Sequence, residues 1–402
     1  MRRPGFTGDV WPDDIQELLL RAALLPSPAG PAAWAAVRPR IDIDHLPGEL
    51  HRLMPLLSRS LSAGGVEETE LPRLKGVYQF TWYRNSLLFN DSADVLSGLY
   101  RAGIPTMLLR GAAMVAAYYC DTGMRPMNDV DVLVRAGDVE RAVRTAQATG
   151  WHRVAGSESL ERRRGAVWLS RGQGRIVCLH SHPSPNLPDG QEEGLWRRSQ
   201  QVTFERVATR VPSSADHLVQ ACADGARANS GSSLRWITDV SRLIRSGDVD
   251  WDVVVTEARR FHVPLLLSEA LRYLDEALDI PVPTGTAATL AASPLTPRER
   301  LAHRLSLTTA PRLPSAAETA GRFIRLTVDM PLRRALATAP AFLEAVLGVE
   351  RGRDVPGLLA RRAVHAVVSP TPPLAALSTA GDTRSRRASV EAALGGSGAE
   401  SR

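Results

Sequence analysis

Apolar residues recur along this chain with two different periods, and the change between them separates helical regions from a mixed region. Residues 13–25, 47–63 and 71–102 repeat their apolar positions at helical spacing, which predicts three amphipathic helices. The third is long, and Asp91 marks the point where a break could fall. Gly103 is expected to end it, because glycine readily takes the left-handed conformation that closes a helix.

Short apolar runs then alternate with helical patterns, which is typical of a small mixed sheet with helices packed on it. Strands are expected at 106–109, 129–134, near 151–155, at 166–170 and at 175–181, with helices at 112–119 and 138–149. Further helices are expected at 213–228, 233–246, 251–260 and 263–279, then more weakly at 296–308, 316–328, 331–348 and 354–366. The pattern predicts an α+β fold: a small mixed β-sheet core flanked by helices, with a mostly helical C-terminal part.

Breaks in these patterns divide the chain into five segments. They are an N-terminal helical segment (1–102), an α/β core (103–212), a helical domain (213–285), C-terminal helices (286–367) and a tail (368–402). The tail is rich in Pro, Ser, Thr, Gly, Ala and Arg, a composition that predicts disorder because it offers little apolar surface to bury.

Composition narrows the class of protein. Hydrophobic residues make up 44% of the 402 residues and charged residues 23%, as in soluble globular proteins. No apolar run reaches the roughly 18 residues of a membrane span, and Asp9, Asp13 and Asp14 stand where a signal peptide would be apolar. We therefore expect a cytoplasmic protein without a membrane partner. Three cysteines without close spacing argue against a disulfide framework.

The net charge of +6 does not by itself indicate a nucleic-acid partner. Nearly all cations are arginines, with Lys75 the only lysine, which is typical of a high-GC bacterium. The arginines are scattered apart from 162–164 and the tail, and no helix-turn-helix, zinc-finger or RNA-binding signature is present. We do not expect nucleic acid as the main partner.

Two aspartates carry the clearest chemical signal. Asp129 and Asp131 lie one residue apart within an apolar run, so on a strand their carboxylates share one face of the sheet. Like charges held that close repel unless a cation lies between them. Mg²⁺ prefers such oxygen ligands, and a magnesium ion held by two carboxylates commonly binds phosphates as well. A solvated turn with accidental spacing is the alternative.

These aspartates stand in a longer ordered motif. It runs Leu109-Arg110-Gly111-Ala112-Ala113, then Tyr118 or Tyr119, Arg125, Asp129, Asp131, Leu133-Val134, with Leu179-His180 and Arg235-Trp236-Ile237-Thr238-Asp239 further on. The motif resembles the polymerase-beta-like nucleotidyltransferase superfamily, and in particular its group of uncharacterised bacterial nucleotidyltransferases. The resemblance covers about residues 10–285.

The resemblance implies a sheet of about five strands and a Mg²⁺-dependent transfer of a nucleoside monophosphate. The donor would be an NTP, with ATP the expected one, and the acceptor a hydroxyl of a small molecule, peptide or protein. It implies Asp129 and Asp131 as catalytic metal ligands, and a phosphate contact through the Gly111 backbone. Arg110, Arg125 and Arg235 would complete the nucleotide-binding residues.

The motif departs from the family pattern at the position of a third carboxylate, where this chain has Cys178. Two readings follow: His180, on the same strand face, serves as the catalytic base, or the protein is a catalytically degenerate nucleotide-binding protein. Cys178, His180 and His182 could instead form a soft-metal site, against the plainer reading of a half-buried cysteine beside a structural histidine. Other residues also have plain alternatives: Gly111 a helix-entry turn, Arg125 a surface arginine, and Arg235 with Asp239 an ordinary i,i+4 pair.

Overall fold

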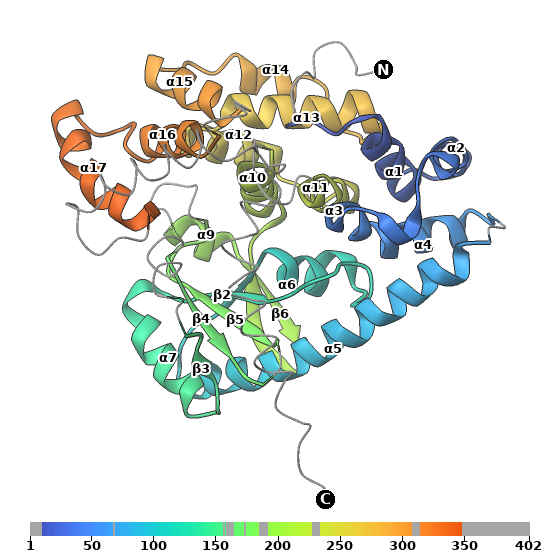
Figure 1. The fold of residues 1–402 in the computed structure, drawn as a ribbon. Helices are drawn as coiled ribbons and strands as arrows, with labels where there is room; N and C mark the ends of the chain where they lie inside the picture. The colour runs from blue at the N-terminus through green and yellow to red at the C-terminus, as the bar shows by residue number, and fades with distance from the viewer. Residues whose placement is uncertain are drawn as a thin grey trace, which may run out of the picture.

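The computed structural model describes residues 10–66, 69–155, 157, 165–172, 174–184, 192–226, 234–307 and 314–347 (Figure 1). The helix expected at 354–366, the tail at 368–402 and the arginines at 162–164 lie outside these residues. The fold is mixed α/β, with a seven-stranded sheet in the core and a helical C-terminal part, so the predicted fold class is confirmed.

Helices form the N-terminal segment: α1 (Asp14–Leu24), α2 (Ala29–Val37), α3 (Gly48–His51), α4 (Met54–Ala63) and α5 (Leu71–Arg101). The first starts as its sequence predicts, because the Asp13 carboxylate accepts from the Gln16 amide while the Gln16 side chain accepts from the Asp13 amide. Helix α5 runs unbroken past Asp91 and ends before Gly103, whose φ is +66°. The single helix expected at 47–63 is divided in two.

The sheet follows α5. Its strands are β1 (Met107–Leu109), β2 (Val130–Leu133), β3 (His152–Arg153), β4 (Ala166–Ser170), β5 (Ile176–His180), β6 (Gln200–Phe204) and β7 (Val207–Val211). Their order is β3-β4-β5-β2-β1-β7-β6, with β2–β5 and β1–β7 parallel and the other neighbours antiparallel. Between the strands lie α6 (Arg110–Met114) with a π-helical turn at Val115–Tyr119, α7 (Val139–Gln147) and α9 (Glu192–Arg198).

The two faces of the sheet have different neighbours. One face presents Val130, Val132 and Leu179 to an apolar core shared with α5 and α7. The other face carries Asp131, Cys178 and His180 at alternating positions of β2 and β5. Leu195 and Trp196 of α9 pack over part of this second face. The polar face of the central strands is therefore turned away from α5.

The helical part contributes buried residues from Ala215 to Leu290 to one large core that it shares with the N-terminal helices. It comprises α10 (Ser214–Gly225), α11 (Arg235–Ser246), α12 (Trp251–Arg260), α13 (Pro264–Leu278), α14 (Thr286–Ala291), α15 (Pro297–Ser306), α16 (Pro314–Leu326) and α17 (Leu332–Leu347). In Figure 1 the sheet lies between α5 and the group formed by α10 to α13. No helix in the described ranges is both long and apolar enough to cross a membrane.

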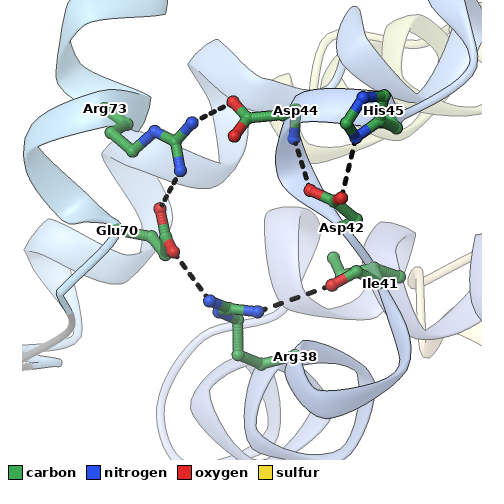
Figure 2. A network of polar contacts seen from close by, with 7 residues as sticks. All are labelled: Arg38, Ile41, Asp42, Asp44, His45, Glu70 and Arg73. Atoms are coloured by element: carbon green, nitrogen blue, oxygen red, sulfur yellow. Dashed lines mark hydrogen bonds and ion pairs between the residues drawn. The ribbon is translucent and has the colours of Figure 1, made fainter.

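A polar network ties the loop before α3 to the start of α5 (Figure 2). Glu70 accepts from Arg38 at 2.7 Å and from Arg73 at 3.0 Å, and Arg73 also contacts Asp44. Most of these groups are partly exposed, so solvent screening keeps the contribution of each pair to stability small. The network joins this loop to the first turn of α5, and residues of α5 share the apolar core on one face of the sheet.

Candidate functional site

The register of β2 and β5 brings Asp131 next to Cys178 and close to His180. Asp131 is the direct Cα partner of Cys178 on one side and of Leu109 at the end of β1 on the other. His180 lies two residues beyond Cys178, and so on the same face. Cys178 and His180 are buried, at 1% and 4% exposure, whereas the Asp131 side chain keeps 13%. A carboxylate, a thiol and an imidazole therefore meet at one partly open point of the sheet.

The contacts at this point are short. His180 Nε2 lies 2.6 Å from Asp131 Oδ1, a distance that requires a proton between the two atoms. Candidate ligand atoms of Asp131, Cys178 and His180 all lie within 4.8 Å of one another. His180 Nδ1 is buried and has no hydrogen-bond partner among the residues that the structure describes. The Nε2 edge of the ring is thus directed at Asp131. If His180 serves as a base through this nitrogen, it takes up a proton beside the Asp131 carboxylate.

Arg110 reaches over the same cluster from the junction of β1 and α6. Its φ is +47°, a left-handed conformation that costs a non-glycine residue about 1 kcal/mol or more. The guanidinium Nη1 lies 3.2 Å from Asp131 Oδ1 and 3.4 Å from His180 Nε2. Burial by itself would lower the pKa of Arg110, but the charges of Asp131, Asp224 and Asp129 outweigh it and raise the pKa above its usual value. The surrounding carboxylates therefore keep the Arg110 guanidinium charged.

Asp224, on α10, is an acid at this site that sequence reasoning missed. Its Oδ2 lies 3.6 Å from Arg110 Nε, and its Oδ1 accepts from the Ser184 hydroxyl. It approaches the cluster from the helical domain, not from the neighbouring strand where a third carboxylate was expected. No local signal marks it, since an aspartate near the end of an amphipathic helix resembles any solvated residue.

Arg125 forms a buried ion pair with Asp239 of α11. Nε lies 3.0 and 3.1 Å from the two carboxylate oxygens, and Nη2 lies 2.7 Å from Oδ2. Tyr119 donates to the same carboxylate at 3.1 Å, and both side chains of the pair are about one-tenth exposed. Arg125 is therefore not a surface arginine, and Asp239 pairs with Arg125 where the sequence spacing suggested Arg235. A phosphate contact by Arg125 would have to use its remaining Nη1.

The loop that carries Arg125 and Asp129 is held by α5. Asn85 donates to the carbonyls of Thr122 and Arg125 at 2.7 and 2.8 Å, and its side-chain oxygen accepts from the Met127 amide at 3.3 Å. Asn85 is 1% exposed, so these bonds satisfy a buried amide. A polar residue on the apolar face of a predicted helix was the only sequence signal for this role.

Gly111 lies against the same arginine. A Cβ at this position would meet Arg125 Nη1 at 2.4 Å and Met127 Sδ at 2.7 Å. Glycine is required here because the ion-paired guanidinium packs directly on the backbone of α6. This packing accounts for the glycine whether or not its backbone also contacts a phosphate.

Replacing Gly111 with alanine should lower the free energy of unfolding by about 2 kcal/mol, since the new methyl group displaces a guanidinium fixed by Asp239. Urea denaturation followed by circular dichroism measures the change. Gly137→Ala is the matched control, because a Cβ there meets nothing within 4 Å, and its stability should change by less than about 0.5 kcal/mol. Equal stability of the two variants would contradict this account of Gly111.

Arg235 is a partly buried cation at the start of α11. Its Nε is buried and has no hydrogen-bond partner among the described residues. Burial, together with the charges of Arg125 and Arg52, lowers the pKa of Arg235 to about 9 despite Asp239 and Asp129 nearby. Arginine still keeps its proton at neutral pH, so a partly buried positive charge is left under-compensated. Such a position favours an anionic ligand.

His217 of α10 lies within electrostatic range of Asp239, Arg125 and Arg110. It is 3% exposed, and burial lowers its pKa to about 4, so the ring is neutral at physiological pH. The charge of Asp239 opposes this shift, whereas Arg125 and Arg110 reinforce it. A neutral ring here adds no positive charge to a region that already holds several arginines.

The donor set fits a hard cation only in part. The carboxylates of Asp129 and Asp131 match the oxygen preference of Mg²⁺, and the charges of both act on Arg110, where they raise its pKa. Cys178 and His180 do not match it, because magnesium takes neither thiolate nor imidazole readily. A magnesium ion would therefore rest on the two aspartates and on a ligand's oxygens.

Comparison with known proteins extends the picture beyond the motif. Residues 48–279 match the family model described as "Uncharacterised nucleotidyltransferase". This range includes α5, the whole sheet, and the helices that carry Asp224 and Asp239. No curated protein matches the chain.

Proposed function

We propose that this chain, which belongs to the family of uncharacterised nucleotidyltransferases, transfers a nucleoside monophosphate from an NTP to a hydroxyl group. The family match supports nucleotidyl transfer in general. The finer proposal is that ATP is the donor, that Mg²⁺ is required, and that the acceptor belongs to a small molecule, peptide or protein. We also propose that the protein is cytoplasmic.

The observation that carries the proposal is the pairing of acids and cations at one place. Asp131 and Asp129 offer carboxylate oxygens, while Arg110 and Arg235 offer positive charge beside them. A nucleoside triphosphate with its metal ion has the complementary arrangement, because its phosphates pair with arginines and its metal with carboxylates.

Each residue then has a role that follows from its contacts. A magnesium ion held by Asp129 and Asp131 would neutralise phosphate charge and stabilise the leaving pyrophosphate. Arg110 exchanges its contact with Asp131 for phosphate oxygens, and Arg235 receives the anion that its buried Nε lacks. The short contact between His180 and Asp131 orients the carboxylate, and Nε2 can accept the proton of the acceptor hydroxyl once the proton that it shares with Asp131 has been released to solvent.

Isothermal titration with ATP, GTP, CTP and UTP, with and without Mg²⁺, tests the binding step. We expect metal-dependent binding of at least one nucleotide and its loss in the Asp129→Ala/Asp131→Ala variant. Pyrophosphate release from the bound nucleotide tests the transfer step. A wild-type protein that binds no nucleotide in the presence of Mg²⁺ would overturn the proposal.

Arg235→Gln should weaken nucleotide binding about 10- to 100-fold, because it removes one charge-assisted contact with a phosphate. The same variant should be at least as stable as the wild type, since it removes an under-compensated buried cation. Titration calorimetry and urea denaturation measure the two effects. Arg101→Gln, an exposed residue with the same charge change, is the control and should alter neither. Unchanged affinity in Arg235→Gln would exclude Arg235 from the binding site.

A degenerate nucleotide-binding protein is the second candidate, favoured by the placement of Cys178 directly beside Asp131. It predicts metal-dependent nucleotide binding without pyrophosphate release under any condition. Release of pyrophosphate that Asp131→Ala abolishes would exclude it.

A further inference from the structure

Cys178, His180 and Asp131 present three different donor atoms to one point, and this combination is the starting observation. The thiol, an imidazole nitrogen and a carboxylate oxygen lie within 4.8 Å of one another, on adjacent strands that fix their spacing. Ligands of a tetrahedral zinc ion lie roughly 3.3–3.8 Å apart, as bond lengths of about 2.0–2.3 Å require. The cluster is therefore close to the spacing of a metal site before any metal binds.

The identity of the donors selects the class of metal. A set of sulfur, nitrogen and oxygen suits Zn²⁺ and Co²⁺, whereas Mg²⁺ takes oxygen ligands almost exclusively. Cys178 and His180 are both nearly fully buried, so a metal ion bound to them would be largely shielded from water.

Two further features indicate that a cation belongs here. His180 Nε2 lies 2.6 Å from Asp131 Oδ1, so these two potential ligand atoms already share one cation, the proton between them. The Arg110 guanidinium lies 3.2 Å from Asp131 Oδ1 and 3.4 Å from His180 Nε2, in the position of a counter-ion. Asp224, 3.6 Å from Arg110 Nε, can keep this arginine when it leaves Asp131.

We propose that Asp131, Cys178 and His180 form a binding site for a divalent transition-metal ion of the Zn²⁺ or Co²⁺ type. The metal replaces the proton shared by His180 and Asp131 and the proton of the Cys178 thiol, and both are released to solvent. Arg110 moves from Asp131 towards Asp224 when the metal enters. The inference rests on the proposed function only in sharing Asp131, and it concerns a second ion with ligands that magnesium does not use.

Cobalt provides a test that needs neither nucleotide nor activity. Co²⁺ added to the metal-free full chain should produce a thiolate-to-cobalt charge-transfer band that saturates at one equivalent and is displaced by Zn²⁺. Cys178→Ser should lose the band and bind Co²⁺ more than about 100-fold more weakly, since it removes a direct ligand. Cys120→Ser, which changes an exposed cysteine, should keep the band. Matched circular dichroism and thermal unfolding establish that Cys178→Ser is folded.

Two more variants sharpen the result. Arg110→Gln should bind Co²⁺ at least about tenfold more tightly, because the competing positive charge is removed. Cys178→Asp should lose preference for Co²⁺ and gain affinity for Mg²⁺, since its donor becomes a carboxylate. No charge-transfer band in the wild type, or a band that survives Cys178→Ser, would overturn the inference. Failure of nucleotide binding with an intact cobalt site would count against the proposed function alone.

Discussion

Asp239→Ala should lower the free energy of unfolding by about 3–5 kcal/mol, the range seen when one partner of a buried ion pair is removed. The carboxylate accepts from Arg125 at 2.7–3.1 Å and from Tyr119 at 3.1 Å, so its loss leaves a buried cation and a buried hydroxyl without partners. The pair also joins the loop before β2 to α11, so the α/β core and the helical part lose a shared anchor. Urea denaturation followed by circular dichroism measures the effect.

Asp275→Ala is the matched control, because Asp275 is exposed on α13. The free energy of unfolding of this variant should stay within about 0.5 kcal/mol of the wild-type value. The double variant Arg125→Met/Asp239→Leu should recover much of the loss, since apolar side chains of similar volume leave no buried charge. A loss below about 1 kcal/mol in Asp239→Ala would show that the pair contributes little to the fold.

Asp131→Asn should reduce kcat/KM for pyrophosphate release by about a thousandfold or more, because it removes a ligand charge at the point where the reacting phosphate is expected. The amide keeps the size of the carboxylate but cannot balance Arg110 or accept the proton shared with His180. A coupled pyrophosphate assay with the nucleotide identified by titration measures the loss.

Asp94→Asn makes the same chemical change on the exposed face of α5, where Asp94 pairs with Arg171, and should leave the rate unchanged. Stability should stay within about 1 kcal/mol of wild type in both variants. An Asp131→Asn protein that retains its rate would move the reaction away from this face of the sheet.

The local pattern of apolar and polar residues predicted the central strands and which of their side chains share a face of the sheet. Each of β1, β2 and β5 is a short apolar run, and the two-residue period of a strand places Cys178 and His180 on one face. The period therefore gave the correct face for both residues before their neighbours were known. The catalytic and binding roles assigned to the motif residues stay predictions until the variants are measured.

The hairpin of β6 and β7 shows where local pattern fails. Its two-residue turn is Glu205-Arg206, with φ of +46° and +70°, a conformation that usually calls for glycine or asparagine. Without those residues the turn carries no sequence signal. Polar residues on an edge strand also weaken the apolar alternation, so a sheet of about five strands was expected where the structure has seven.

The candidate site depends on contacts between residues far apart in the chain. Asp224 approaches Arg110 because α10 packs close to the sheet. Asp239 selects Arg125 over its helical neighbour Arg235 because the loop before β2 lies against α11. Neither choice follows from spacing, since i,i+4 proximity offers only about 0.3–0.5 kcal/mol and tertiary burial offers several times more.

By itself, the sequence determined the central strands and placed Asp131 on β2 with Asp129 immediately before it, because periodicity and backbone geometry act over a few residues. Only the tertiary structure decided which groups surround that pair. It brought Cys178 and His180 to Asp131 and placed Arg110 as the counter-ion of Asp131. It also left the positive charge of Arg235 under-compensated. Those outcomes depend on burial and on long-range packing, which set the cost of every unpaired charge and which no local pattern encodes.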